Sequence, residues 1–176
     1  VLPNDPIDQA MKEKKALFNS LGTQKGAATN FVAIGSSGQG VLGSEYYSQN
    51  FYSLSQYKKC LDGDTLPIYR GMKLSEDDKI VRHLMNDVRT YFEVDFEEYK
   101  NIFNINFKDY FSKEINSLSE YINDGLVVIN DKKIEITGLG TNFTYQISNV
   151  FDKYDPPTSN YEKRLEKIKK VAVHPS

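Results

Sequence analysis

Short apolar runs separated by turn residues make up the first 70 positions of the chain, and they predict short elements. Asp5 and Pro6 favour a helix over residues 6–18, because aspartate caps helices and proline suits the first helical turn. The glycines and alanines of residues 19–30 predict a loop. The apolar run 31–35 predicts a buried strand that opens into a glycine-rich turn.

The stretch that follows this turn carries aromatic and polar residues. Residues 46–52 predict extended or looped chain. Ser53 predicts the start of a helix that runs through Leu61 and ends near Gly63, and Pro67 interrupts the chain after it.

A helical period of apolar residues begins after Ser75. Ser75 and Asp78 form a capping-box-like start to a first helix. Its apolar face consists of Ile80, Leu84, Val88 and Tyr91. A short helix is predicted over residues 95–103. A third begins after Asn106 and ends before Gly125, and its apolar stripe consists of Phe107, Phe111, Ile115, Leu118 and Ile122.

A β-hairpin and a last helix complete this pattern. Residues 126–129 and 133–137 flank an Asn130-Asp131 turn and predict the hairpin. The last helix ends at Pro156-Pro157, and its apolar face consists of Leu139, Phe143, Ile147, Val150, Phe151 and Tyr154. Three helices, a hairpin and a closing helix are the order of a winged-helix-like module. The predicted fold class is therefore α+β.

Charge and composition narrow the classes of partner. Lys and Arg total 22 and Asp and Glu total 24, so the net charge of -2 gives no electrostatic reason to expect nucleic acid or an anionic membrane. No apolar run has the length of a membrane span, and the start is not a signal peptide. The chain begins with Val1 rather than Met, so we expect an excised or truncated piece of an intracellular protein.

Candidate metal ligands are few and far apart. Cys60, His83 and His174 are not at ligand spacing from one another, and a single cysteine excludes an internal disulfide and an all-cysteine metal site. We therefore predict no metal site in this chain. His83 is expected to face solvent or to be partly packed, and Cys60 to be a small, semi-buried residue.

Three other patterns favour structural interpretations. The glycine-rich segment 35–40 lacks the Gly-Lys-Ser/Thr ending of a P-loop, so a tight turn is favoured over an anion site. The helix 107–123 carries more acidic than basic residues, which disfavours DNA binding. The acidic pairs Asp77-Asp78 and Glu97-Glu98 lie near predicted helix N-termini, where the helix dipole favours acids, so acid–base catalysis is not assigned to them.

A series of matched pieces resembles a known family in order and spacing. The pieces are Arg70-Gly71, Leu74-Ser75-Glu76-Asp77-Asp78, Asn106-Phe107-Lys108-Asp109-Tyr110-Phe111, Asp124-Gly125-Leu126-Val127 and Asn149-Val150-Phe151-Asp152-Lys153-Tyr154. They resemble the C-terminal part of oxygen-independent coproporphyrinogen III oxidase, a radical-SAM oxidoreductase of anaerobic haem biosynthesis. The resemblance covers residues 3–154.

This resemblance implies a division into domains. Residues 1–70 would be the incomplete end of the catalytic radical-SAM α/β barrel. Residues 71–157 would be a helical C-terminal domain with a β-hairpin, which closes over the active site, and residues 158–176 a charged tail.

The resemblance also implies site residues in the first part. Asn19 and Gly22 correspond to an Asn-Phe-Gln-Gly loop of the family. Gly35, Ser37 and Gln39 correspond to a Gly-x-Ser-Ala-Ile turn, where Gln39 replaces the isoleucine. The implied cofactor-binding residues, contacts to a second S-adenosylmethionine, are Gly22, Gly35, Ser37 and Gln39. No catalytic or metal-binding residue is assigned. A further family segment, Gly-x-x-Tyr-x-Gln-Asn, corresponds to Gly43, Tyr46, Gln49 and Asn50.

The implied activity belongs to a longer, cytoplasmic parent. In the family, a 4Fe–4S cluster on a CxxxCxxC motif cleaves S-adenosylmethionine, and two propionates of coproporphyrinogen III lose CO2 and become vinyls. This chain has one cysteine, so we expect it to hold no cofactor and to be inactive by itself. The implied partners are the upstream barrel of the same polypeptide and a tetrapyrrole substrate, and an exposed apolar face would also allow the chain to self-associate.

Two alternatives remain at this point. Several family arginines are replaced, as by Val81-Arg82 for a double arginine and Tyr145-Gln146 for Arg-Asn. Because propionates favour basic contacts, the parent could be a divergent radical-SAM paralogue that acts on another tetrapyrrole. The second alternative is a non-catalytic helical binding or interaction module.

Overall fold

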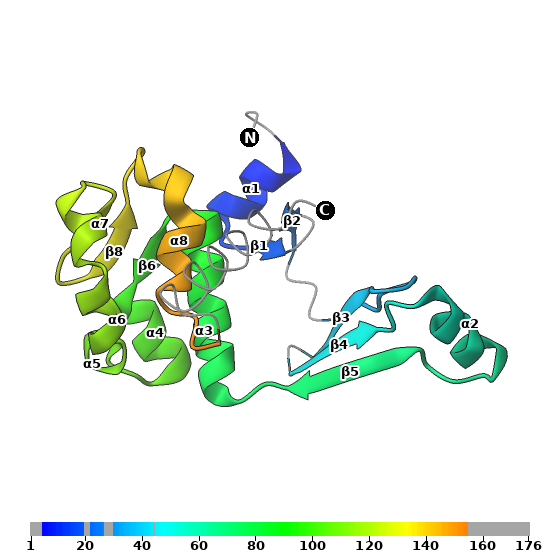
Figure 1. Ribbon diagram of the computed structural model, residues 1–176. Coiled ribbons are helices and arrows are strands. Elements are labelled where there is room, and N and C mark those ends of the chain that lie inside the picture. The colour runs from blue at the N-terminus through cyan, green and yellow to red at the C-terminus, as the bar shows by residue number, and fades with distance from the viewer. Residues whose placement is uncertain (1–4, 20–21, 27–29, 44, 155–176) are drawn as a thin grey trace, which may run out of the picture. The chain divides into compact units, whose positions relative to one another are not determined.

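The computed structural model describes residues 5–19, 22–26, 30–43 and 45–154 (Figure 1). The chain divides into two compact units, Val1–Arg82 and His83–Ser176. Helices and small antiparallel sheets occur in both units, so the predicted α+β class is confirmed. The predicted tail 158–176 lies outside the described residues.

The first unit contains one small hairpin and one three-stranded sheet. Its elements are α1 (Pro6–Lys12), β1 (Ala16–Asn19), β2 (Gly22–Lys25), β3 (Gln39–Leu42), β4 (Tyr46–Asn50), α2 (Leu54–Asp62) and β5 (Ile68–Lys73). β1 pairs with β2, and the second sheet has the antiparallel order β3-β4-β5.

Helix α1 begins as predicted and ends early. The side chain of Asp5 accepts a hydrogen bond from the backbone N–H of Ile7 at 2.7 Å, which is the expected cap. The helix was predicted to reach residue 18 but ends at Lys12, because Lys14 has φ 55°, a left-handed conformation that stops helical hydrogen bonding. The predicted loop over 19–30 is wrong in its first half, since β1 and β2 pair there as a hairpin.

The predicted buried strand over residues 31–35 is also wrong. Phe31 makes a single antiparallel bridge to Val41, and the rest of the run forms no strand. Ile34 is 93% exposed, so the apolar run does not mark a core segment in this chain.

The predictions for residues 46–63 are confirmed in position. β4 provides the extended segment, and α2 follows Ser53 and ends before Gly63. The Ser53 side chain caps no backbone N–H of α2, and its hydroxyl lies 2.8 Å from the Ser55 hydroxyl instead. β5 was not predicted as a strand.

The boundary between the units falls within α3 (Glu76–Asn86), and the second unit begins at His83 in that helix. Its elements are η1 (Asp87–Tyr91), β6 (Glu93–Asp95), α4 (Phe96–Phe103), α5 (Phe107–Tyr110), α6 (Ser112–Ser117), α7 (Ser119–Asn123), β7 (Val127–Ile129), β8 (Lys133–Ile136), η2 (Gly140–Phe143) and α8 (Thr144–Asn149). The three strands form one antiparallel sheet in the order β6-β8-β7. The predicted β7–β8 hairpin is confirmed, and β6 was missed.

The start of α3 is confirmed as a capping box. The Ser75 hydroxyl accepts from the backbone N–H of Asp78 at 3.2 Å, and the Asp78 carboxylate accepts from the backbone N–H of Ser75 at 2.8 Å. The helical path continues into the π-helical turn η1 and ends at Phe92, which has φ 61°.

The predicted long helix over 106–124 is three short helices. Asn106 caps the first of them, as expected, by accepting from the backbone N–H groups of Lys108 and Asp109. The helical segments are interrupted at Phe111 and Leu118, and Phe107, Phe111 and Leu118 are buried while Ile122 is exposed. The predicted apolar stripe is therefore confirmed at Phe107, Phe111 and Leu118 but does not extend to Ile122.

The predicted last helix is a 3-10 turn, η2, followed by the six-residue α8. Ile147 and Phe151 are buried, but Leu139 and Tyr154 are exposed, so the predicted apolar face is shorter than expected. The half-buried Arg89 side chain hydrogen-bonds Ser148 at 2.8 Å and thereby joins α8 to η1.

Aromatic side chains fill the core of the second unit. Tyr99, Phe107 and Phe111 follow one another with ring centroids 4.8 to 4.9 Å apart, and Phe151 packs edge-on against Phe111. Among the described residues, no helix is both long and apolar enough to cross a membrane.

Candidate functional site

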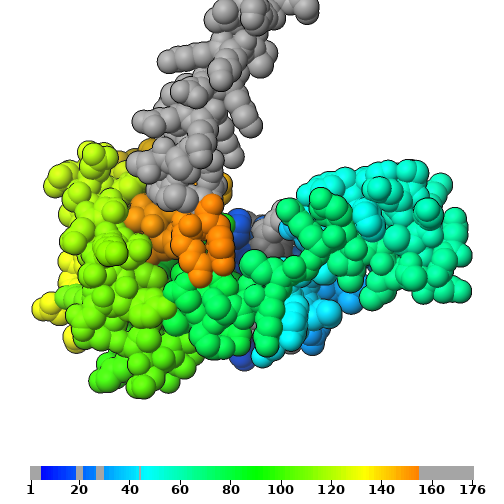
Figure 2. Space-filling view, turned by 60° about the horizontal axis from the view of Figure 1, so that its bottom comes forward, coloured from blue at the N-terminus to red at the C-terminus, as the bar shows by residue number. Residues whose placement is uncertain are grey.

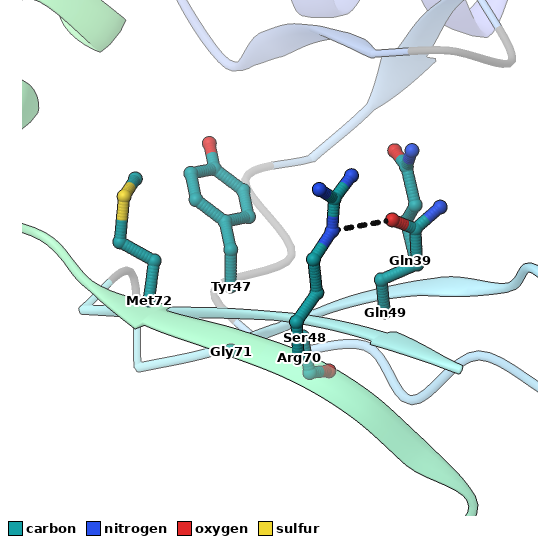
Figure 3. Close-up of a pocket in the computed structure, with 7 residues that line it drawn as sticks. All are labelled: Gln39, Tyr47, Ser48, Gln49, Arg70, Gly71 and Met72. Carbon is teal, nitrogen blue, oxygen red and sulfur yellow. Dashed lines mark hydrogen bonds between the residues drawn. The ribbon is translucent and has the colours of Figure 1, made fainter. Parts of the chain in front are cut away.

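One face of the β3-β4-β5 sheet lines a pocket of about 440 Å³ (Figure 3). The lining residues are Gln39, Tyr47, Ser48, Gln49, Arg70, Gly71 and Met72. Tyr47 and Gln49 are two apart on β4, and Arg70 and Met72 are two apart on β5, so each pair projects from the same face of its strand. Figure 3 shows these four side chains and that of Gln39 on one side of the sheet.

Strand register divides this pocket into a polar half and a less polar half. Gln49 lies opposite Gln39 on β3 and opposite Arg70 on β5, while Tyr47 lies opposite Met72. One half therefore presents two amides and a guanidinium, and the other an aromatic ring and a thioether.

The polar half is held in place by a hydrogen-bond network. Arg70 donates through Nε to the Gln49 side-chain oxygen at 2.9 Å and through Nη2 to the Tyr52 hydroxyl at 3.3 Å. The Tyr52 hydroxyl donates to the same Gln49 oxygen at 3.0 Å. Gln49 itself is buried, so the network fixes the guanidinium over the sheet.

This guanidinium has no ion-pair partner in the part of the chain that the structure describes. Its hydrogen-bond partners, Gln49 at Nε and Tyr52 at Nη2, are both neutral, so neither balances its positive charge. A guanidinium in such surroundings suits an anionic group, such as a carboxylate, on a ligand.

Buried Asn50 joins this strand to the glycine-rich loop. Its side-chain amide donates to the carbonyl oxygens of Ala33 at 3.0 Å and Gly35 at 2.9 Å. A Cβ at Gly38 would lie 2.8 Å from the Ala33 Cβ and 3.3 Å from the Asn50 amide nitrogen, so glycine is required at that position. The loop is thus closely packed against the end of β4.

Two backbone donors of the loop are used within the protein. Gly35 N–H donates to the Tyr57 hydroxyl at 2.9 Å, and Ser37 N–H donates to the Phe51 carbonyl at 2.9 Å. These donors are not available to an anion. The tight-turn interpretation therefore describes this loop better than an anion-binding loop does.

The four residues predicted to bind a cofactor fall in two places. Gly35 and Ser37 lie in the loop, with φ 103° and 63°, and Gln39 lines the pocket at the start of β3. Gly22 begins β2 in the separate hairpin and is not among the described residues that line the pocket. The cofactor contacts themselves remain a prediction.

Arg70 and Tyr52 were not predicted as site residues, and neither was Gln49. A period of two along residues 46–50 would have placed Tyr47 and Gln49 on one face. Arg70 could not be added to that face, because the strand that carries it was not predicted from the sequence.

The other candidate groups have structural surroundings. The Asp78 carboxylate belongs to the α3 capping box, and Asp95, not Glu97, caps α4. Among the described residues, one group of three side chains could hold a metal ion, namely His83, Asp87 and Glu98. The prediction that His83 lies among Arg82 and Asp87, without other ligands near it, missed Glu98, which is near in space but 15 residues away in sequence.

Comparison with known proteins places this chain beside one group of enzymes. Residues 74–143 match the family model described as HemN C-terminal domain. The oxygen-independent coproporphyrinogen III oxidase of Helicobacter pylori strain J99 is 32% identical over 142 residues, which are 81% of this chain and 30% of the relative. The enzyme of that name from Pseudomonas aeruginosa PAO1 is 30% identical over 88% of this chain and 34% of the relative.

A solved structure agrees with these relatives. It is described as coproporphyrinogen III oxidase (HemN) from Escherichia coli, a radical SAM enzyme, and it matches with a TM-score of 0.81 and 28% identity over 86% of this chain and 35% of its own. The chain thus spans about a third of the length of the relatives that it matches. The resemblance inferred from the sequence motifs is confirmed.

Proposed function

We propose, from the membership of residues 74–143 in the HemN C-terminal domain family, that this chain is the C-terminal part of an oxygen-independent coproporphyrinogen III oxidase. The observation that carries the proposal is the structural match at a TM-score of 0.81 over 86% of the chain. The parent would be a cytoplasmic enzyme of porphyrin and haem biosynthesis.

The parent reaction is the oxidative decarboxylation of two propionates of coproporphyrinogen III to vinyl groups. A 4Fe–4S cluster with S-adenosylmethionine would supply the radical chemistry. The single cysteine of this chain cannot provide the three thiolates that the cluster needs, so the cluster would be held by the upstream part of the same polypeptide.

The first unit would contribute the last elements of the barrel. The loop from Gly35 to Gln39 is closely packed against β4, and Gln39 opens onto the pocket that contains Arg70. Gly22, Gly35, Ser37 and Gln39 would contact a second S-adenosylmethionine, while Arg70 would orient an acidic group of a ligand. Such positioning is what a protein adds to cofactor chemistry.

An incomplete barrel agrees with the exposure of the β3-β4-β5 sheet. Every residue of β5 is exposed, and exposed apolar side chains on this sheet include Leu42, Ile68 and Met72. A sheet in a complete α/β barrel is covered on both faces. The upstream barrel would therefore be the partner that covers this surface, which Figure 2 draws in cyan to green.

The second unit would act as a winged-helix-like lid over the substrate. The strand β6 follows the first helix and joins the β7–β8 hairpin in the order β6-β8-β7, as the first strand does in winged-helix domains. The unit would exclude water from the reacting propionates. Nucleic acid is not the expected ligand, because the third helical region of the unit carries excess acidic charge and would repel phosphates.

The decisive experiment uses the full-length parent, reconstituted without oxygen. We expect it to bind iron and to convert coproporphyrinogen III to protoporphyrinogen IX with S-adenosylmethionine and a reductant. Iron binding and S-adenosylmethionine cleavage without conversion would favour the paralogue with another tetrapyrrole substrate. A parent that binds no iron would contradict the proposal and leave the binding-module alternative.

The isolated 176-residue chain provides the matching control. We expect it to cleave no S-adenosylmethionine under the same conditions, because it lacks the cluster ligands. Turnover by this chain alone would contradict the proposal that the upstream part of the polypeptide holds the cluster.

A further inference from the structure

A histidine and two carboxylates meet at one point in the second unit. His83 and Asp87 are four residues apart on the helical path of α3 and η1, so their side chains share a face. Glu98 approaches the same face from α4. One ligand atom from each of the three side chains lies within 4.8 Å of the others.

The spacing of these atoms is close to that of a metal coordination shell. His83 Nε2 lies 3.5 Å from Asp87 Oδ2 and 3.3 Å from Glu98 Oε1. Ligands at about 2.0–2.1 Å from a tetrahedral zinc ion are about 3.3–3.4 Å apart. Both histidine–carboxylate distances therefore match edges of such a tetrahedron before any side chain moves.

Surrounding side chains hold the imidazole and the buried carboxylate. The His83 ring is edge-on to the rings of Tyr99 and Phe103, each with its centroid at 5.3 Å. Asp87 is 2% exposed, and its Oδ2 accepts a hydrogen bond from the Tyr99 hydroxyl at 2.9 Å. Burial and the nearby Asp87 raise the pKa of Tyr99, so this hydroxyl stays a donor.

This arrangement resembles the outer shell of known metal sites, in which a hydrogen-bonded partner orients a ligating carboxylate. The side chains of His83 and Glu98 are 29% and 30% exposed, so an ion can enter from solvent and keep a water ligand. Two carboxylates beside an imidazole also form a donor set that a divalent cation can bind.

We propose that His83, Asp87 and Glu98 form a binding site for a divalent metal ion of the zinc class. Tyr99 is a positioning residue that orients Asp87. The site is separate from the pocket around Arg70, and it would bind metal whether or not the parent carries out the oxidase reaction.

The test uses the 176-residue chain after treatment with a chelator, with Zn²⁺ and Co²⁺ as probes. We expect one equivalent of Zn²⁺ to bind in calorimetry, with a rise in the melting temperature. Co²⁺ should give a visible d–d absorption of the strength typical of four- or five-coordinate sites. The spectrum reports on coordination and does not depend on any enzymatic activity.

Variants assign the site to these residues. Glu98→Gln should weaken Zn²⁺ binding at least about tenfold, and Tyr99→Phe by about tenfold, since loss of outer-shell partners costs that much in metal sites. Glu97→Gln is the matched control, because Glu97 is an exposed neighbour on α4 outside the cluster. Circular dichroism in the absence of metal checks that each variant is folded.

Two results would overturn the proposal. The first is equal Zn²⁺ affinity in Glu98→Gln and Glu97→Gln, which would place the ion elsewhere, for example at Cys60. The second is no Zn²⁺ or Co²⁺ binding at millimolar concentration. The cluster would then be a histidine paired with two carboxylates.

Discussion

At the scale of single residues, the second unit depends on one position where no side chain fits. Gly140 begins η2, and a Cβ placed there would overlap the carbonyl oxygen of Leu126 and lie 2.9 Å from Ile136 Cγ2. Leu126 precedes β7 and Ile136 ends β8, so the turn into the last helical segment passes directly over the hairpin. The backbone oxygen cannot move without changing the strand that follows it.

The substitution Gly140→Ala should therefore destabilise the chain by about 2 kcal/mol or more, since overpacking against backbone forces a shift of the chain. Urea unfolding followed by circular dichroism gives the change in free energy of unfolding. Gly138→Ala is the control, because a Cβ there meets nothing within 4 Å, and it should change the stability by less than about 1 kcal/mol in either direction. Equal effects of the two substitutions would show that the close approach at Gly140 does not limit stability.

Residue-level predictions succeeded where local chemistry decides the structure. Asp5, Ser75 and Asn106 were predicted as caps, and each makes the side-chain hydrogen bond expected of a cap. Asp95 caps α4 in the same way, but it was predicted only as the start of that helix. Ser53 was predicted by the same rule and makes no such bond. Position before a helix is therefore easier to infer than the capping interaction itself.

At the scale of elements, Ser75 before α3 and Ser53 before α2 allow the stability contribution of a capping bond to be compared directly. The Ser75 hydroxyl donates to Asp78 Oδ2 at 2.7 Å and accepts from the Asp78 N–H, and Asp78 is buried. Ser75→Ala removes both bonds and should lower the free energy of unfolding by about 1 kcal/mol, the usual cost of a lost N-cap.

The matched substitution Ser53→Ala should cost less than about 0.5 kcal/mol. Ser53 caps no backbone N–H of α2, and the substitution removes only an exposed bond to the Ser55 hydroxyl. Thermal unfolding of the two variants and of the unsubstituted 176-residue chain measures both effects. A larger loss for Ser53→Ala than for Ser75→Ala would contradict the assignment of the capping box.

The elements that the sequence mispredicted share a physical cause. The helix expected over 6–18 and the single helix expected over 106–124 were inferred from apolar spacing, which carries no information on where the backbone leaves the helical path. Lys14 leaves it at φ 55°, and Phe111 and Leu118 interrupt the second helix. β6 consists of three residues and pairs with a strand about 40 positions away, so no local signal could identify it.

The same limit applied to the candidate site. The motifs pointed to the glycine-rich loop and to Arg70-Gly71, but the sequence could not bring them together. Gln39 and Arg70 line one pocket because the strand register sets Gln49 opposite both of them. The cluster of His83 and Glu98 was missed for the same reason, since its members lie on separate helices.

At the scale of the whole molecule, the two units differ in how much apolar surface they cover. Of the 18 buried apolar residues in the described part of the chain, 13 lie in the second unit, from Leu84 to Phe151. The first unit leaves apolar side chains exposed on all three strands of the β3-β4-β5 sheet, including Leu42 on β3, Tyr46 on β4 and Ile68 on β5. Its edge strand β5 is exposed along its whole length. Exposed strand edges with apolar side chains favour pairing between chains.

The isolated chain should therefore self-associate in a concentration-dependent way through this sheet. The double substitution Leu42→Lys and Ile68→Lys places charges on both edge strands and should shift the chain toward monomer, because lysine on an edge opposes strand pairing. Val128→Lys is the control, since Val128 is equally exposed on β7 of the second unit and should leave association unchanged. Sedimentation velocity over a range of concentrations gives the weight-average mass of all three proteins. Two results would mean that the exposed sheet is not a surface for self-association. One is an unsubstituted 176-residue chain that stays monomeric at every concentration, and the other is a loss of association in Val128→Lys alone.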